Sequence, residues 1–260
     1  MTTAAQAPSA AEALLPLRAQ GWAMWKRPAD VARVDVLREA VGELLDAHAP
    51  EALWAAQTMP LGEHAIITPT GFAIPSLLKH RPDLRPLVLP SALLDAVTSL
   101  LGAGARLELL GMVATDRSRP FFPWHTHIDG TDESERVQAN RWPRIDRLRR
   151  IFTLLYLDDI DDDGGPLLVL PRRVGDPCEP PFDVAKPEWQ GQVELLPRAG
   201  TLVAIDECTW HAARSMRRDG KRVFIGAYFA AAETDPAPWA DPTLATWDLT
   251  ALAAAPTEST

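Results

Sequence analysis

The sequence is poor in the features that define several specialised classes of protein. It has only two cysteines among 260 residues, Cys178 and Cys208, which excludes a disulfide framework and suits a reducing cytoplasm. The formal net charge of −9 argues against a nucleic-acid partner, because phosphate backbones are bound by basic surfaces. No apolar run approaches the roughly 20 residues of a membrane helix, and the first residues lack the basic and apolar regions of a signal peptide. We therefore expect a cytoplasmic protein without a membrane partner.

The length and composition of the chain favour one large domain. A chain of 260 residues can bury a substantial core. Residues 1–9 are small and polar and are predicted to be disordered, residues 10–235 to form a single domain, and residues 236–260 to form an irregular tail rich in Ala, Pro and Asp. Arginine outnumbers lysine and alanine is abundant, a composition typical of GC-rich bacterial genomes.

Two kinds of periodicity divide the chain. In the first part, apolar spacing predicts helices near 9–20, 30–47, 75–80 and 90–101, with short strands at 22–25 and 65–68. The second part predicts short strands separated by Gly- and Pro-containing turns, at 106–114, 124–129, 151–157, 167–170, 193–196, 201–206 and 221–229. Many short strands bounded in this way indicate a mainly β fold, a barrel or jelly roll, with helices on one outer face.

The most informative motif is His125-Thr-His127-Ile-Asp129, which is followed much later by His211. Side chains at i and i+2 of a strand point to the same face, so we expect His127 and Asp129 to reach one metal ion. His211, which comes directly after a distant strand, would complete a set of two histidines and one carboxylate. That ligand set leaves coordination positions open and is typical of non-haem Fe(II) oxygenases. The motif therefore predicts an iron site that activates O2.

His125 leaves a second assignment open. It also lies two residues from His127 and would face the same ion, which permits a three-histidine, cupin-like site completed by His211. Asp132 or Glu133 would then be the acidic ligand, but Glu133 lies at the wrong separation, and the segment lacks the glycine-flanked spacing usual around cupin ligands. We therefore expect His125 to contact the substrate or to support a ligand, unless it is a solvated histidine at the start of the strand.

Arg222 is the candidate for binding an anion. It begins an alternating face of the last predicted strand, together with Phe224, Gly226 and Tyr228. If that face lines the barrel, the guanidinium is buried and needs a partner, and a carboxylate bound through two hydrogen bonds is the best one. The alternative is an exposed arginine at the edge of a sheet.

From about residue 106 to 230 the chain resembles the phytanoyl-CoA dioxygenase family of Fe(II)- and 2-oxoglutarate-dependent oxygenases. The similar segments are Trp-His-Thr-His-Ile-Asp (124–129), Asp-Gly-Gly-Pro-Leu-Leu-Val-Leu-Pro (163–171) and the segment 199–211, followed by Arg222. The resemblance implies a double-stranded β-helix of the jelly-roll or cupin type. It also implies that His127, Asp129 and His211 bind iron and that Arg222 holds the distal carboxylate of 2-oxoglutarate.

The resemblance implies roles for several further residues. Thr153 and Met112 match positions that line the cosubstrate pocket in the family, although each is also a plausible barrel-filling residue. Trp124 and Trp210 would wall the substrate pocket or fill the core. The chain departs from the family at Ala213, where a small hydroxyl residue is common, and this removes one hydrogen bond to 2-oxoglutarate.

The implied activity is that of a dioxygenase. It would couple decarboxylation of 2-oxoglutarate to succinate with O2-dependent oxidation of an unactivated C–H bond in a small molecule, with hydroxylation as the default outcome. The arginine-rich segment 130–150 could bind an anionic or carrier-tethered substrate, although a solvated face paired with neighbouring acids is the simpler explanation. A non-catalytic binding protein on the same barrel is the remaining alternative.

Overall fold

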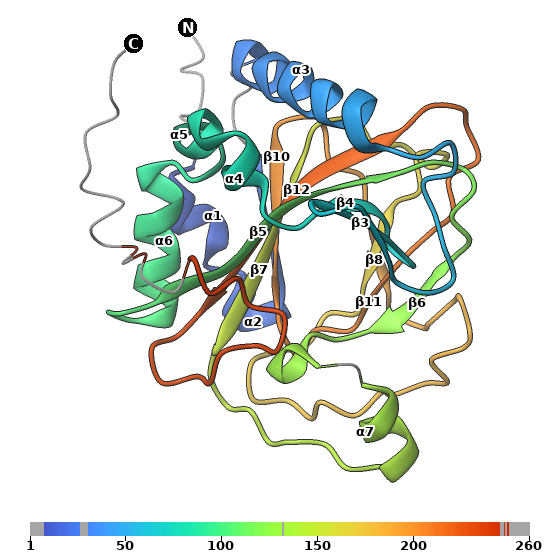
Figure 1. Ribbon diagram of the computed structural model, residues 1–260. Coiled ribbons are helices and arrows are strands. Elements are labelled where there is room, and N and C mark those ends of the chain that lie inside the picture. The colour runs from blue at the N-terminus through green and yellow to red at the C-terminus, as the bar shows by residue number, and fades with distance from the viewer. Residues whose placement is uncertain (1–7, 27–30, 132, 245–246, 248, 250–260) are drawn as a thin grey trace, which may run out of the picture.

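Two antiparallel sheets face each other and form the body of the molecule (Figure 1). The computed structural model describes residues 8–26, 31–131, 133–244, 247 and 249. The large sheet has eight strands in the order β1 (Trp22–Lys26), β10 (Thr201–Asp206), β7 (Arg150–Tyr156), β12 (Arg222–Ala230), β5 (Arg106–Thr115), β4 (Gly71–Ile74), β3 (Ala65–Thr68) and β2 (Met59–Leu61). The small sheet has four, in the order β6 (Phe122–His125), β11 (His211–Ala213), β8 (Leu167–Val169) and β9 (Val193–Leu195).

The large sheet is buried on both faces, and strand β7 shows how its sequence achieves this. All seven of its residues are buried. Phe152, Leu154 and Tyr156 point into the space between the sheets, where they pack with residues of the small sheet. Ile151 and Leu155 point to the other face, into a second apolar core. Alternate side chains of a strand lie on opposite faces, so one continuous apolar run supplies both cores.

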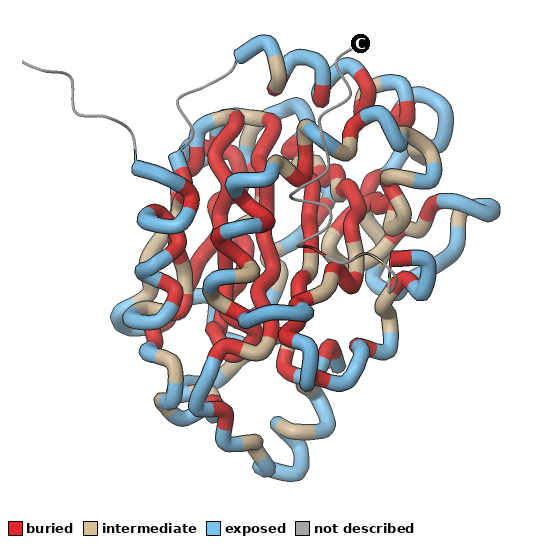
Figure 2. Tube along the Cα trace, turned by 90° about the vertical axis from the view of Figure 1, so that its left-hand side faces the viewer, coloured by how far each residue is buried: buried red, intermediate tan, exposed pale blue. Residues whose placement is uncertain are grey.

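Helices cover the outer face of the large sheet, and their outward faces are exposed (Figure 2). Ser9 starts the first helix with a reciprocal capping box to Glu12, which satisfies two otherwise free backbone N–H groups. These helices are α1 (Ala10–Leu14), α2 (Leu17–Gln20), α3 (Val31–His48), α4 (Leu77–His80), α5 (Arg85–Val88) and α6 (Ser91–Leu101), with the short 3-10 turn η1 (Pro82–Leu84). Helix α7 (Ser134–Ala139) lies away from this face and buries none of its residues, and the 3-10 turn η2 (Ile128–Gly130) follows β6.

Most predicted elements are present in the structure, but strands β2, β4 and β11 and helix α7 were not predicted. The helix predicted near 9–20 is two short helices, because Pro16 interrupts the backbone hydrogen bonding. The strand predicted at 124–129 ends at His125, and the chain then turns through η2. Residues 1–7 and most of the predicted tail lie outside the described residues, and the domain limits stay a prediction. No single described helix is both long and apolar enough to cross a membrane. The bent pair Pro82–Val88 and Ser91–Leu101 reaches the required length and composition only when its two helices are taken together.

Candidate metal centre and anion site

Three histidines converge between the two sheets, and we call them the inner triad: His125, His127 and His211. One ligand nitrogen from each lies within 4.8 Å of the others. His125 ends β6 and His211 begins β11, and the antiparallel register sets the two directly opposite each other. Their ring centroids are 3.9 Å apart, and the ring of His127 lies 5.1 Å from His125 and 5.0 Å from His211.

Backbone carbonyls fix the orientation of two of these rings. Nδ1 of His125 lies 2.9 Å from the carbonyl oxygen of Pro123, and Nδ1 of His211 lies 2.9 Å from that of Thr209. A carbonyl can only accept, so Nδ1 carries the proton in both rings. The lone pair of Nε2 is then available to a metal ion, and this second hydrogen bond is the usual support of a ligating histidine.

Burial keeps two members of the inner triad, His127 and His211, in the protonation state that binds metals. It lowers the pKa of His127 and of His211 well below the usual value, and the neighbouring His125 lowers both further. These imidazoles are therefore neutral near pH 7. Three nitrogens about 2.1 Å from one ion and at right angles to one another would place the ring centroids about 4.5 Å apart, which is close to the observed separations. The donor set fits a ferrous ion with open positions.

Asp129 does not join this group, and the expectation that it shares a strand face with His127 is wrong. The strand ends at His125, and Asp129 adopts a left-handed backbone conformation with φ 56° inside η2. Its carboxylate Oδ1 accepts a hydrogen bond from Arg149 Nη2 at 2.7 Å, and Oδ2 lies 3.6 Å from Arg136. The residue that strand β6 places beside His211 is instead His125.

A buried acid, Glu207, shapes the turn that carries His127. Its side chain is fully buried, and it accepts hydrogen bonds from Arg149 Nε at 2.8 Å and from the backbone N–H of Asp129 at 3.1 Å. Its carbonyl accepts from the N–H of His127 at 2.9 Å. Glu207 lies four residues before His211, so one segment positions two members of the inner triad. This role could not be predicted from the sequence, because an acid that follows a strand is ordinarily solvated.

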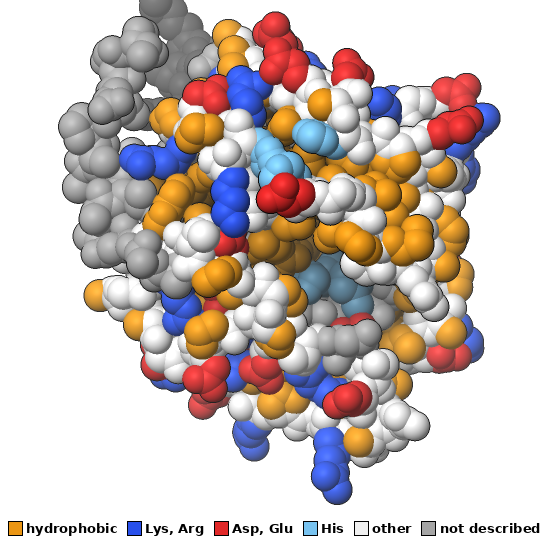
Figure 3. Space-filling view, in the orientation of Figure 1, with side chains coloured by type: hydrophobic (Ala, Val, Ile, Leu, Met, Phe, Trp, Pro, Cys, Tyr) orange, Lys and Arg blue, Asp and Glu red, His pale blue; other side chains and the backbone are white. Residues whose placement is uncertain are grey.

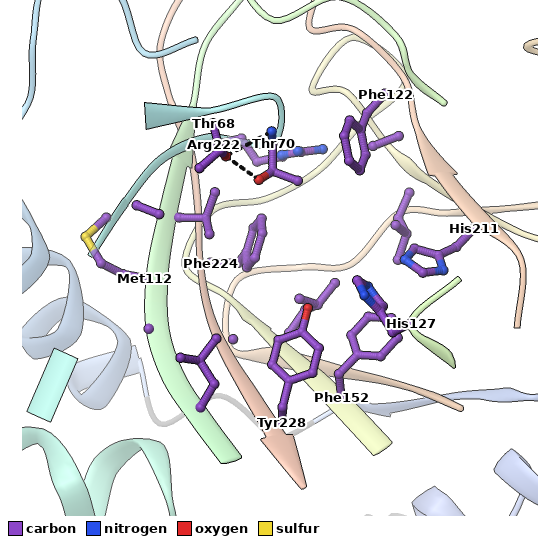
Figure 4. A pocket seen from close by; sticks show the side chains of 18 of the residues that line it. Thr68, Thr70, Met112, Phe122, His127, Phe152, His211, Arg222, Phe224 and Tyr228 are labelled. Carbon is purple, nitrogen blue, oxygen red and sulfur yellow. Dashed lines mark hydrogen bonds between the residues drawn. The ribbon is translucent and has the colours of Figure 1, made fainter. Parts of the chain in front are cut away.

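The inner triad lines a cavity of about 230 Å³ that opens as a hollow on the face seen in Figure 3. Figure 4 shows His127 and His211 on one side of it, with Phe152 and Tyr228 beside them and Arg222 further away. None of the described residues that line the cavity is an acid. Its charged lining residues, Arg119 and Arg222, are both cations, so beyond the inner triad the cavity favours an anion.

Arg222 lies in this cavity, as predicted from its alternating strand, and only 4% of it is exposed. Phe224, Gly226 and Tyr228 line the same cavity, so the proposed inward face of β12 is confirmed and the exposed-edge alternative is wrong. One guanidinium nitrogen donates to the carbonyl of Gly165, whereas Nε has no partner among the described residues. Burial lowers the pKa of Arg222, since no carboxylate offsets the desolvation.

Arg119 is a second buried cation that the sequence analysis missed. It also lines the cavity, is only 1% exposed, and donates to the carbonyls of Arg214 at 2.6 Å and Pro120 at 3.0 Å. Its Nε has no partner among the described residues. Burial, followed by repulsion from Arg222, lowers the pKa of Arg119 to about 9. Its loop has the composition of an exposed turn, so the sequence carries no sign of this burial.

The remaining predicted residues divide between the cavity and the core. Met112 lines the cavity, at the edge of the view in Figure 4 that lies opposite the histidines. Thr153 is buried on the other face of β7, where its hydroxyl lies 3.4 Å from the carbonyl of Ala227, and it does not line the cavity. Trp124 and Trp210 belong to a separate apolar cluster, so they fill the core.

Most arginines of the arginine-rich segment 130–150 pair with acids. Arg150 donates to Glu108 at 2.7 Å, Arg147 forms an ion pair with Glu233 at 3.1 Å, and Arg149 pairs with Glu207. None of the arginines between 130 and 150 lines the cavity. The pairing with acids therefore accounts for Arg136, Arg147, Arg149 and Arg150, and Arg119 and Arg222 replace this segment as the candidate anion binders.

Comparison with known proteins shows the fold. No protein-family model matches the chain, and no curated protein matches it in sequence. Among solved structures, the non-haem α-ketoglutarate-dependent carbocyclase SnoK from nogalamycin biosynthesis is 19% identical, with a TM-score of 0.62 over 87% of each chain. EctD from S. alaskensis, crystallised with 2-oxoglutarate and 5-hydroxyectoine, is 19% identical, with a TM-score of 0.63 over 96% of this chain and 86% of EctD.

A third structure, HygX from Streptomyces hygroscopicus with nickel and 2-oxoglutarate bound, is 14% identical, with a TM-score of 0.59 over 84% of this chain and 85% of HygX. Similarity at these identities shows a shared fold. The predicted jelly-roll barrel with flanking helices is therefore confirmed, whereas the closer resemblance to the phytanoyl-CoA dioxygenase family stays a prediction.

Proposed function

We propose that this protein is an Fe(II)- and 2-oxoglutarate-dependent dioxygenase that oxidises a C–H bond of a small molecule. One observation carries the proposal: three metal-ligating imidazoles and a buried arginine line the same cavity, and no acid is found among the described residues of its wall. The three imidazoles bind the metal ion, and the arginine binds an anion that also reaches the ion. A 2-oxo dicarboxylate satisfies both requirements with one molecule.

In this proposal the inner triad holds the ion, and His125 replaces Asp129 as the third ligand. Three neutral imidazoles leave the full double positive charge of the ferrous ion, whereas a carboxylate ligand would halve it. The cosubstrate is a dianion, so the charge of the site and that of its ligand match. When bound, the ion supplies the redox chemistry that couples O2 to the 2-oxo acid, which leaves as succinate and CO2.

The protein's own groups would orient the two small ligands. Arg222 donates to the distal carboxylate of 2-oxoglutarate. Arg119 lies close enough to Arg222 for the two cations to repel each other, and it donates to the same carboxylate. Both guanidiniums then gain the partner that their buried Nε atoms lack. Phe152, Phe224 and Tyr228 wall the cavity and keep bulk water from the reacting C–H bond.

The nature of the substrate and the outcome of the reaction belong to the same proposal. We infer that the substrate is a small molecule, because the cavity lies between the two sheets and has a volume of about 230 Å³. Hydroxylation is the default outcome. SnoK is described as a carbocyclase, and another protein of similar fold, SnoN, is described as an epimerase. In other proteins, therefore, the same barrel supports more than one type of reaction.

Anaerobic addition of Fe(II) and 2-oxoglutarate to the purified protein tests the proposal. Chelation of the 2-oxo acid by ferrous iron gives a metal-to-ligand charge-transfer band in the visible spectrum. We expect the band in the wild type and its loss in His211→Gln. A wild-type protein that binds Fe(II) but forms no band, and releases no succinate with any candidate substrate, would overturn the proposal.

The three-histidine ligand set also favours a second candidate, a cupin-type metalloenzyme that oxidises its substrate without a 2-oxo acid. The same observation supports it, namely that Asp129 lies outside the inner triad. Of its two candidate acidic ligands, Asp132 lies outside the described residues, and Glu133 contacts the backbone N–H of Thr126 at 3.3 Å. Substrate oxidation that proceeds without added 2-oxoglutarate and without succinate release would select this alternative.

A further inference from the structure

The histidines of this chain form two groups, and the second group lies on the surface. The sequence has six histidines, and three of them form the inner triad. The other three meet elsewhere, and we call them the outer triad: His48, His64 and His80. Their ring centroids are 4.6 Å apart for His64 and His80, 6.1 Å for His48 and His80, and 6.5 Å for His48 and His64.

The outer triad is assembled from three elements that are distant in the sequence. His48 is the last residue of α3, His80 is the last residue of α4, and His64 lies in the turn between β2 and β3. Figure 3 shows histidine side chains at two places on one face, in the hollow and on the rim above it. The three rings contact one another edge to face, so the fold brings three imidazoles from separate elements together at one place on the surface.

The charges around the outer triad favour a cation. The carboxylate of Glu63 lies 3.8 Å from Nε2 of His64. His48 ends an 18-residue helix, and the C-terminal end of a helix carries partial negative charge. The nearest basic groups are already paired, Lys79 with Asp241 at 3.6 Å and Arg81 with Asp83 and Glu43 at 2.8 Å each.

We propose that His48, His64 and His80 form a second metal site, which binds a divalent transition-metal ion of the zinc class. Imidazole nitrogens bind Zn²⁺ at about 2.0–2.1 Å, so a tetrahedral ion would hold the ring centroids about 5.2 Å apart. The observed separations of 4.6–6.5 Å differ from this value by up to about 1.3 Å, so the rings must rotate to converge on an ion, and His48 and His64 are exposed enough to do so. Glu63 or a water molecule supplies the fourth ligand.

A bound ion would connect three parts of the rim. It would tie the end of α3 to the β2–β3 hairpin and to the end of α4. His64 directly precedes β3, and Ile66 and Thr68 of that strand line the cavity. The outer site therefore braces the wall of the cavity without contributing a group to it. This inference stands whether or not the proposed oxygenase activity is correct.

Titration with Co²⁺ tests the outer site, because tetrahedral Co²⁺ absorbs much more strongly in the visible range than octahedral Co²⁺. We expect the metal-free wild type to bind two equivalents, one of them with the intense tetrahedral spectrum. The triple variant H48A/H64A/H80A should bind one equivalent and lose that spectrum. His211→Gln should show the reverse, keeping the tetrahedral spectrum and losing the weaker one. Circular dichroism establishes that each variant is folded.

Single variants decide whether all three rings take part. Each of His48→Ala, His64→Ala and His80→Ala should weaken binding of the tetrahedral Co²⁺ at least tenfold. Asp46→Asn, which removes a charge from the same end of α3 but no imidazole, is the control and should retain both equivalents. Two equivalents in the triple variant, or an unchanged tetrahedral spectrum in His48→Ala, would overturn the proposal. Loss of only the inner equivalent, by contrast, would bear on the proposed oxygenase alone.

Discussion

The inner and outer triads contain the same three side chains in opposite surroundings. In the inner triad two rings are held by backbone carbonyls at 2.9 Å, and burial lowers the pKa of His127 and His211. In the outer triad His64 is half exposed, and the rings spread to 6.5 Å. The inner rings are therefore preorganised for an ion, whereas the outer rings must move to bind one. The identity of the ligand residues alone therefore does not distinguish the proposed reactive centre at the inner triad from the proposed structural site at the outer triad.

The charges beyond the rings separate the two triads more sharply. The inner triad shares its cavity with Arg119 and Arg222, and no described lining residue is an acid. The outer triad has the carboxylate of Glu63 beside it. An ion in the inner site therefore keeps its charge for an incoming anion, whereas an ion in the outer site is partly neutralised by the protein. The first arrangement suits the proposed binding of a 2-oxo acid, which is itself an anion.

Removing an inner ligand should have the largest effect. We expect His211→Gln to lower turnover roughly 1000-fold, equivalent to about 4 kcal/mol of activation free energy, because the ion that carries the redox chemistry is lost. Succinate release measured against bound iron separates lost metal from lost catalysis. His64→Ala is the matched control from the outer triad and should turn over at the wild-type rate. Equal losses in both variants would remove the distinction between the triads.

The two buried arginines should have the next largest effect. Arg222→Gln and Arg119→Gln should each weaken binding of 2-oxoglutarate about 10- to 100-fold, since each removes a charge-assisted hydrogen bond from a buried carboxylate. 2-Oxobutyrate, which lacks the distal carboxylate, is the control ligand, and its weaker affinity should be nearly unchanged in both variants. If Arg119→Gln binds 2-oxoglutarate as tightly as the wild type, Arg119 serves only to hold its loop.

Replacing Asp129 should have a smaller effect. If its partner is Arg149 and not the ion, Asp129→Asn should retain iron and turnover. Its carboxyl side chain is 48% exposed, so loss of the ion pair should lower the free energy of unfolding by only about 0.5–1 kcal/mol. Chemical denaturation and iron content measure the two quantities. Loss of iron from Asp129→Asn would restore the two-histidine, one-carboxylate assignment that the sequence predicted.

The fate of Asp129 shows how far the sequence could be followed. Strand periodicity correctly predicted the barrel and the inward face of β12, because alternation in a buried strand is a local property. It failed after His125, where the buried Glu207 accepts the N–H of Asp129 and draws the chain into a turn. Arg119 was missed for the same reason, since burial of a loop residue depends on segments distant in the sequence. The outer triad likewise joins three separate elements.

The smallest expected effect concerns the stability that the outer triad contributes. Without metal, His64→Ala should change the free energy of unfolding by less than about 0.5 kcal/mol, as is usual for exposed side chains. With Zn²⁺ at 100 times its dissociation constant, a site present only in the folded state adds about 2.7 kcal/mol. Measured in the His211→Gln background, where the inner site is absent, thermal unfolding should show this zinc-dependent gain, and adding His64→Ala should abolish it. A gain that survives both substitutions would place the stabilising ion somewhere other than the outer triad.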